Sequence, residues 1–128
     1  MTQEHKELLL RDLCARLPYG VKISIPDLWI QKREIETLDE IFKGDDGLYR
    51  VNSKGQCIEH IKPYLFPLSS MTEEQTEELI KLINTGQNDN NEFMRSLCRI
   101  EFYHKNHLDY RGLIPLGLAI NATGLNIY

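Results

Sequence analysis

The segment from Gly112 to Tyr128 carries no charged side chain and ends on an aromatic residue. Terminal segments of most domains are polar and frayed, whereas apolar side chains left in water are costly. This surface must therefore be covered. The sequence predicts that the segment packs on its own domain, against the two helices expected before it, or on a partner protein.

Length and composition predict one ordinary globular domain spanning residues 1–128, large enough to bury its own core. The chain is 41% hydrophobic and 27% charged, with a formal net charge of −4. This balance gives no overall attraction to nucleic acid or to an anionic membrane. No apolar run is long enough to cross a bilayer. Three widely spaced cysteines argue against a disulfide framework and for a cytoplasmic, reducing location.

The first part of the chain predicts a helix followed by short strands. Apolar residues at helical spacing predict a helix over residues 4–17, which Pro18 ends. Residues 21–68 form a β-rich region that begins with alternating apolar and polar residues at 21–25. Residues 34–43 fit either a helix or a strand. The strand is favoured because Asp45-Asp46-Gly47 is typical of a hairpin turn leading into 48–51.

The β-rich region is expected to end with a strand at 57–61 and a rigid connector at 62–68 that leaves the sheet. Such closely spaced short strands predict a small antiparallel sheet or an SH3-like partial barrel.

Residues 72–128 form the predicted helical region. Thr72 and Gln75 have the spacing of a capping box, which predicts a helix start. Gly86 is its expected stop, and its expected buried face consists of Leu79, Ile80, Leu82 and Ile83. A second helix over 92–107 is expected to carry Phe93, Leu97, Ile100 and Tyr103 or His104 along one side. Residues 117–120 fit a short helix or strand. The predicted fold class is α+β.

Ligand-type side chains are densest in the region from Glu101 to Asp109. Glu101 and His104 share a helical face, and His107 follows three residues later, so a metal-dependent hydrolase is one hypothesis. Cys98, His104 and Asp109 are the residue types of a cysteine hydrolase. Both sets are incomplete. The simpler interpretation is a helix C-terminus with basic residues at its negative end and a structural cysteine. No metal or other cofactor is expected.

Nucleic-acid binding on a small barrel is the alternative function. The basic residues that would support it are Lys6, Arg11, Arg16, Lys22, Lys32, Arg33, Arg95, Arg99, Lys105 and Arg111. Acidic residues are interleaved among them, which favours an ordinary mixed surface.

Aromatic residues provide the candidate binding surfaces for a protein partner. Trp29, Tyr64 and Phe66 could line an exposed groove, although core packing is the more common role of aromatics in a small domain. Ile127 and Tyr128 form the second candidate surface.

Three segments resemble a group of small uncharacterised proteins from prophages and mobile elements of gut Bacteroides-type bacteria. The segments read DLCARLPYGVK at 12–22, IKPYLFPLSSMT at 61–72 and HLDYRGLI at 107–114, the last followed by GLA at 117–119. The resemblance implies a phage-associated accessory protein of a bacterial cytoplasm and implies no activity or ligand.

The function favoured by the sequence is a non-catalytic module that binds protein, with an enzymatic role less favoured. A homodimer formed through the uncharged segment is compatible with the same features.

Overall fold

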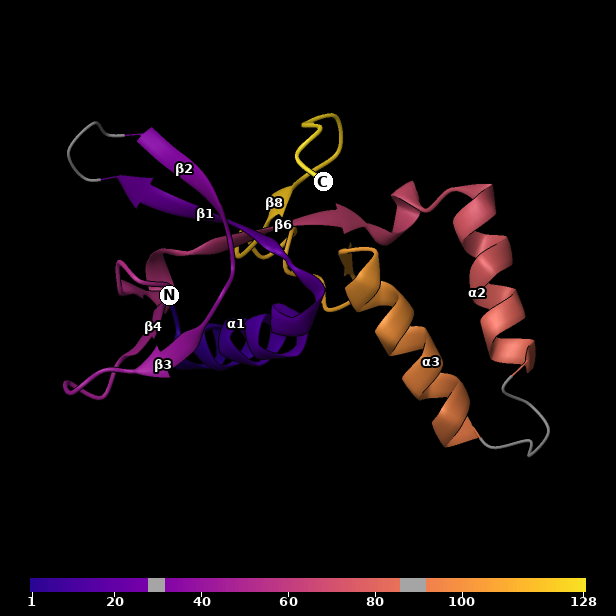
Figure 1. Cartoon of the computed structure of the whole chain (residues 1–128), viewed down its shortest axis with the longest axis horizontal. Helices are drawn as coiled ribbons and strands as arrows, with labels where there is room; N and C mark the ends of the chain where they lie inside the picture. Colours follow the sequence, from indigo (N-terminus) through magenta and orange to yellow (C-terminus); the bar gives the residue numbers. More distant parts are fainter. Residues whose placement is uncertain (28–31, 86–91) are drawn as a thin grey trace.

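The computed structural model describes residues 1–27, 32–85 and 92–128. Its α+β architecture matches the fold class that the sequence predicts. A helix, two small sheets and the C-terminal segment form a body, from which a pair of helices projects (Figure 1). Within the described residues the strands form two sheets and no closed barrel.

Helix α1 (Gln3–Arg16) begins where the Thr2 side chain accepts a hydrogen bond from the His5 amide. It packs Leu9 and Leu13, both fully buried, into the main core. The chain then turns through η1 (Leu17–Tyr19) and Gly20, whose φ of 69° is a left-handed conformation that suits glycine.

The larger sheet has the order β2–β1–β6–β7, with β8 also paired to β6. Its antiparallel strands are β1 (Lys22–Asp27), β2 (Lys32–Thr37) and β6 (Lys62–Pro67). Two short strands, β7 (Leu108–Asp109) and β8 (Ile120–Asn121), run parallel to β6. The smaller antiparallel sheet consists of β3 (Ile41–Lys43), β4 (Tyr49–Val51) and β5 (Gln56–Cys57).

The strand interpretation of residues 34–43 is confirmed, with a break. β2 and β3 belong to different sheets, and the buried Leu38 lies between them. The Asn52 side chain holds this corner: its carbonyl accepts from the Asp39 amide, and its NH2 group donates to the Thr37 carbonyl. The turn expected at 45–47 joins β3 to β4.

Two expectations for the β-rich region are wrong. The strand expected at 57–61 ends at Cys57 and continues as η2 (Ile58–His60). The segment 62–68 is no connector, because most of it forms β6, the strand to which β1, β7 and β8 all pair. Pro63 and Pro67 suggest an interruption because neither can donate a ladder hydrogen bond. The run between them, Tyr64-Leu65-Phe66, has the continuous apolar character of a strand covered on both faces.

The uncharged segment docks on the body, but against the sheet and α1 instead of the two later helices. Leu113, Leu118 and Ala119 belong to the same core cluster as Leu9 and Leu13. The amide of Ala122 donates to the carbonyl of Leu65 in β6. The expected docking on the helices is therefore wrong. The short element expected at 117–120 is displaced: residues 117–119 form a turn and a bend, and β8 begins only at Ile120.

Helices α2 (Glu73–Thr85) and α3 (Glu92–Lys105) form the projecting pair. The capping box is confirmed: the Gln75 amide donates to Thr72 Oγ1 at 3.1 Å, and the Thr72 amide donates to Gln75 Oε1 at 3.0 Å. The expected stop at Gly86 lies outside the described residues. After η3 (Leu68–Ser70), a small second core of Leu79, Phe102 and Leu108 connects the pair to the body.

Candidate functional site

A buried cluster of charges lies where α1 meets the start of the C-terminal segment. Arg16 and Asp12 are both fully buried, and Arg16 Nε donates to Asp12 Oδ2 at 2.8 Å. Arg111 Nε donates to the other oxygen of Asp12 at 3.1 Å. Arg16 Nη2 donates to the Leu108 carbonyl at 2.7 Å, which ties α1 to β7. The guanidinium groups of Arg16 and Arg111 lie 5.5 and 5.0 Å, respectively, from the Tyr110 ring centroid.

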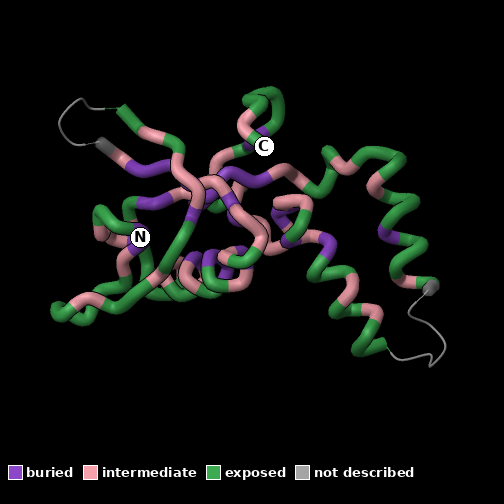
Figure 2. Tube along the Cα trace, in the orientation of Figure 1, coloured by how far each residue is buried: buried purple, intermediate pink, exposed green. Residues whose placement is uncertain are grey.

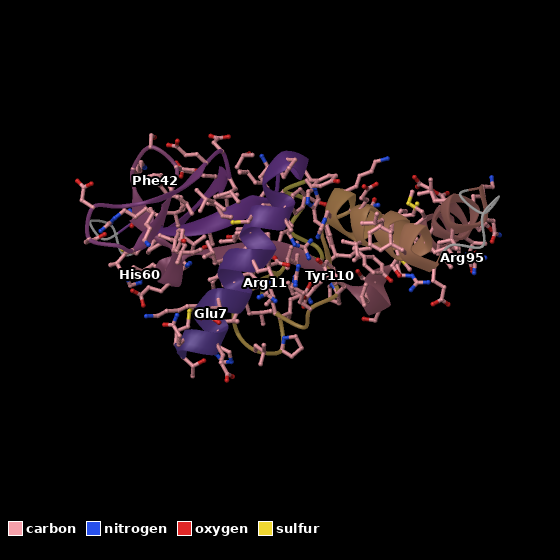
Figure 3. The ribbon with its side chains drawn as sticks, turned by 90° about the horizontal axis from the view of Figure 1, so that it is seen from below. Glu7, Arg11, Phe42, His60, Arg95 and Tyr110 are labelled. Atoms are coloured by element: carbon pink, nitrogen blue, oxygen red, sulfur yellow. The ribbon has the colours of Figure 1, made fainter. Side chains whose placement is uncertain are left out.

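The electrostatics of this cluster fit a structural role. Burial raises the pKa of Asp12, and the two arginines oppose that shift. Arg16 Nη1 has no hydrogen-bond partner among the described residues. A buried ion pair of this kind is costly to break, because removing one partner leaves an uncompensated charge. The cluster joins segments that are distant in sequence, and Figure 3 shows Tyr110 at this junction of α1 and α3.

His104 does not form the acid–base partnership proposed for a cysteine hydrolase. Its Nε2 lies 2.7 Å from the Tyr110 hydroxyl. Asp109 instead accepts hydrogen bonds from the backbone amides of Leu113 and Ile114, at 2.8 and 2.9 Å. A triad needs the carboxylate to orient the histidine, and here the carboxylate caps a backbone turn.

The Glu101–Asp109 region also falls short of a metal site. Glu101 is exposed, whereas His104 is buried and His107 stacks on Tyr128 with the ring centroids 3.8 Å apart. No group of three or more metal-ligating side chains occurs within the described residues. Burial and the charge of Arg16 lower the pKa of both histidines to about 4, with Arg111 adding to the effect at His104 and Lys22 at His107. Both imidazoles are therefore neutral at pH 7.

Tyr128 bridges two strands of the larger sheet. Its hydroxyl accepts from the Lys22 amide at 2.8 Å and donates to the Tyr64 carbonyl at 2.6 Å. Lys22 and Tyr64 would be the next pair in the β1–β6 register after Ile23 and Pro63. The hydroxyl thus replaces a direct ladder bond at the place where the two strands separate. Burial raises the pKa of the Tyr128 hydroxyl to about 12.

The aromatic surfaces expected from the sequence are largely occupied by internal packing. Tyr64 is only 7% exposed, and Phe66 packs against the second core cluster. Ile127 is half-buried. Tyr128 keeps 43% of its surface exposed, while its hydroxyl is bonded inside the sheet. Trp29 lies outside the described residues. Whether a partner contacts these side chains remains a prediction.

Several basic residues of the nucleic-acid hypothesis bond within the molecule. Arg16 is fully buried, and Arg111 binds Asp12. Arg33 donates to the Ser24 side chain and to the carbonyls of Ser24 and His60. These contacts reduce the basic surface on which the hypothesis depends.

Exposed apolar side chains gather on the projecting helices. Of the expected buried face of α2, Leu79 is buried and Ile83 is half-buried against the second core, whereas Ile80 is 52% and Leu82 41% exposed. On α3, the exposed fractions are 68% for Phe93, 44% for Met94, and 37% for both Leu97 and Ile100. Figure 2 shows the contrast between this pair and the buried residues of the body. Helical periodicity identifies an apolar face but does not reveal whether anything covers it.

Leu82 and α3 border a common hollow. A cavity of about 230 Å³ is lined by Leu82, by Tyr19 of the body, and by four residues of α3: Cys98, Glu101, Phe102 and Lys105. Met94 and Leu97 each lie one helical turn from a lining residue. We call the set of Leu82, Phe93, Met94, Leu97 and Ile100 the α3 face.

A separate cavity of about 430 Å³ lies on the body. It is lined by α1 and the segments around β4 and β5, and the ion pair of Lys6 with Glu59, 3.3 Å long, lies at its margin. Its apolar lining comes from Leu10, Leu48, Tyr49 and Ile58, and the half-buried Cys57 lies beside them.

Comparison with protein-family models, with curated proteins and with solved structures finds no match for this chain. Among the helices of the described residues, none combines the length and the apolar character needed to cross a bilayer.

Proposed function

We propose that this chain is a non-catalytic module that binds protein, and that its contact surface is the α3 face. The observation that carries the proposal is the exposure of several large apolar side chains along one projecting helix pair. An apolar patch of this kind on a surface helix is typical of a protein interaction site.

The chemistry of the buried polar residues supports a non-catalytic role. His104 and Asp109, which a cysteine hydrolase would need bonded to each other, each bind a different part of the chain, and Asp12 binds Arg16 and Arg111. In these roles they stabilise the junction of α1, α3 and the C-terminal segment.

The proposal includes a cytoplasmic, phage-associated setting. Three cysteines free of disulfides support a reducing compartment. The segments at 12–22, 61–72 and 107–114, which resemble proteins of prophages and mobile elements, support the phage association.

The test is capture of protein by the immobilised full chain from nuclease-treated bacterial lysate, with a differently tagged second copy of the chain added. Wild type is compared with Leu97→Glu, which places a charge in the α3 face. The matched control is Ile80→Glu, the same substitution at a more exposed residue on the opposite side of α2 from Leu82, since two residues turn a helix by about 200°.

We expect wild type and Ile80→Glu to retain the same protein, either the second copy or a lysate protein, and Leu97→Glu to lose it. Circular dichroism establishes that all three are folded. Equal capture by the three proteins, or capture that requires intact nucleic acid, would contradict the proposal.

A further inference from the structure

We infer that the occupant of the α3 face is a second copy of this chain, which forms a reversible two-fold dimer. This inference rests on the proposed function and names the partner. The two helix pairs pack face to face in it, so that α2 of one copy lies over α3 of the other.

The exposed area fits such a dimer. At roughly 200 Å² for a fully exposed side chain of this size, the exposed fractions of the α3 face amount to about 450 Å² of apolar surface on each copy. Two copies would bury about 900 Å². Homodimer interfaces are about 65% apolar, which implies a total of about 1,400 Å², within the range of about 1,200–2,000 Å² for stable interfaces.

The contiguity of the face supports one compact contact. Phe93, Leu97 and Ile100 follow the i, i+4, i+7 spacing that places side chains in one stripe along a helix. Met94 lies between this stripe and Leu82, because Leu82 lines the hollow with Cys98 and Met94 is one turn from Cys98. The stripe spans about 10 Å at 1.5 Å per residue, which is a suitable length for two helices to pack across.

Formal charge selects how the copies are arranged. Helix α2 carries four glutamates and one lysine, a charge of −3. Helix α3 carries two arginines, one lysine and two glutamates, a charge of +1 with His104 neutral. Placing α2 over the partner's α3 brings opposite net charges together, whereas placing α2 over α2 would oppose two acidic helices. Within one copy, Lys105 of α3 already pairs with Glu78 of α2 at 4.0 Å, which is the same pairing of a basic α3 residue with an acidic α2 residue.

The size of the interface predicts a moderate affinity. An interface of this area with no large aromatic anchor beyond Phe93 is expected to have a dissociation constant on the order of 1–100 μM. The chain should therefore be monomeric when dilute and dimeric at high concentration.

Sedimentation equilibrium of the purified full chain tests the inference. We expect the mass of wild type to rise from the monomer value of 15.0 kDa toward twice that value as the concentration increases. Leu97→Glu should weaken association at least about tenfold, and Ile80→Glu should change it less than about twofold. Circular dichroism and the thermal midpoint confirm that both variants keep the fold.

Two outcomes would overturn the inference. The first is a monomer at every concentration up to about 500 μM, which is well above the expected dissociation constant. The second is a dimer that Leu97→Glu leaves intact. If wild type is monomeric but Leu97→Glu still loses a different protein in the capture experiment, the self-association is wrong while the protein-binding function stands. If neither self-association nor capture depends on Leu97, both are wrong.

Discussion

Tyr128 is a single side chain that supplies the contact two strands fail to make directly. Its ring stacks on His107, and its hydroxyl joins the backbones of β1 and β6. An apolar terminal segment indicates from sequence that something packs there. Sequence spacing contains no sign that a hydroxyl would take the place of a ladder bond, because Lys22, Tyr64 and Tyr128 meet only in the folded chain.

Tyr128→Phe keeps the ring and removes the hydroxyl. The Lys22 amide and the Tyr64 carbonyl then lose a partner, so we expect the free energy of unfolding to fall by about 1–2 kcal/mol. Urea denaturation measures the change. Tyr49→Phe, at a residue of similar exposure on β4, is the control and should have less effect. Equal effects of the two substitutions would mean that the Tyr128 hydroxyl contributes little.

His104 and His107 make the stability depend on pH. Their folded pKa values of about 4 lie below the value of about 6.5 in an unfolded chain. Their contribution is fully present above pH 6.5 and is lost as pH falls toward 4, because the unfolded chain then binds protons that the folded chain does not. The raised pKa of Asp12 acts in the opposite direction, because its contribution to stability is present below the unfolded value of 3.8 and is lost as pH rises above it.

Thermal midpoints between pH 7.5 and 5 measure this dependence. We expect His104→Gln to reduce the slope of midpoint against pH, and His60→Gln, at an exposed residue, to leave it unchanged. The comparison uses slopes, so a general loss of stability in His104→Gln does not affect it. A wild-type midpoint that stays constant over this range would exclude the histidine contribution.

At the scale of elements, local sequence signals predict the helices and turns correctly, but they do not predict which strands pair. Caps, turns and helical spacing predicted α1, α2, α3 and the turn at 45–47 because each depends on neighbouring residues. The role of β6 depends on pairing with three strands distant in sequence, whereas its two prolines favour a connector over a strand. The exposure of Leu82 and Leu97 could not be predicted, because helical periodicity shows which residues share a face and not whether another segment packs on that face.

The capping box at the start of α2 is a local feature whose loss should have a local effect. Thr72→Ala removes the acceptor for the Gln75 amide, for which we expect a loss of about 0.5–2 kcal/mol in the stability of α2. Amide hydrogen exchange should accelerate in α2 and remain unchanged in α1. Thr123→Ala, at an exposed residue of the C-terminal segment, is the control. Uniform acceleration across the chain would show that α2 unfolds only together with the body.

For the whole molecule, the C-terminal segment is part of the core. Leu113, Leu118 and Ala122 are each at most 4% exposed, and β8 pairs with β6. Deleting residues 113–128 removes these contacts together with Tyr128. We expect the truncated chain to lose its cooperative thermal transition and its near-ultraviolet circular dichroism. An unchanged midpoint and solubility would show that the segment is dispensable.

The bonds of Tyr128 also have a consequence for the time course of folding. They join residues 106 and 64 positions apart in the chain, and chains dominated by such distant contacts search longer before the contacts can form. During synthesis, β1 and β6 are made well before residue 128. The hydrogen bonds that join Lys22 and Tyr64 through Tyr128 therefore cannot form until that residue has been added. A nascent chain stalled short of that residue would leave the junction of β1 and β6 open to pairing with other strands.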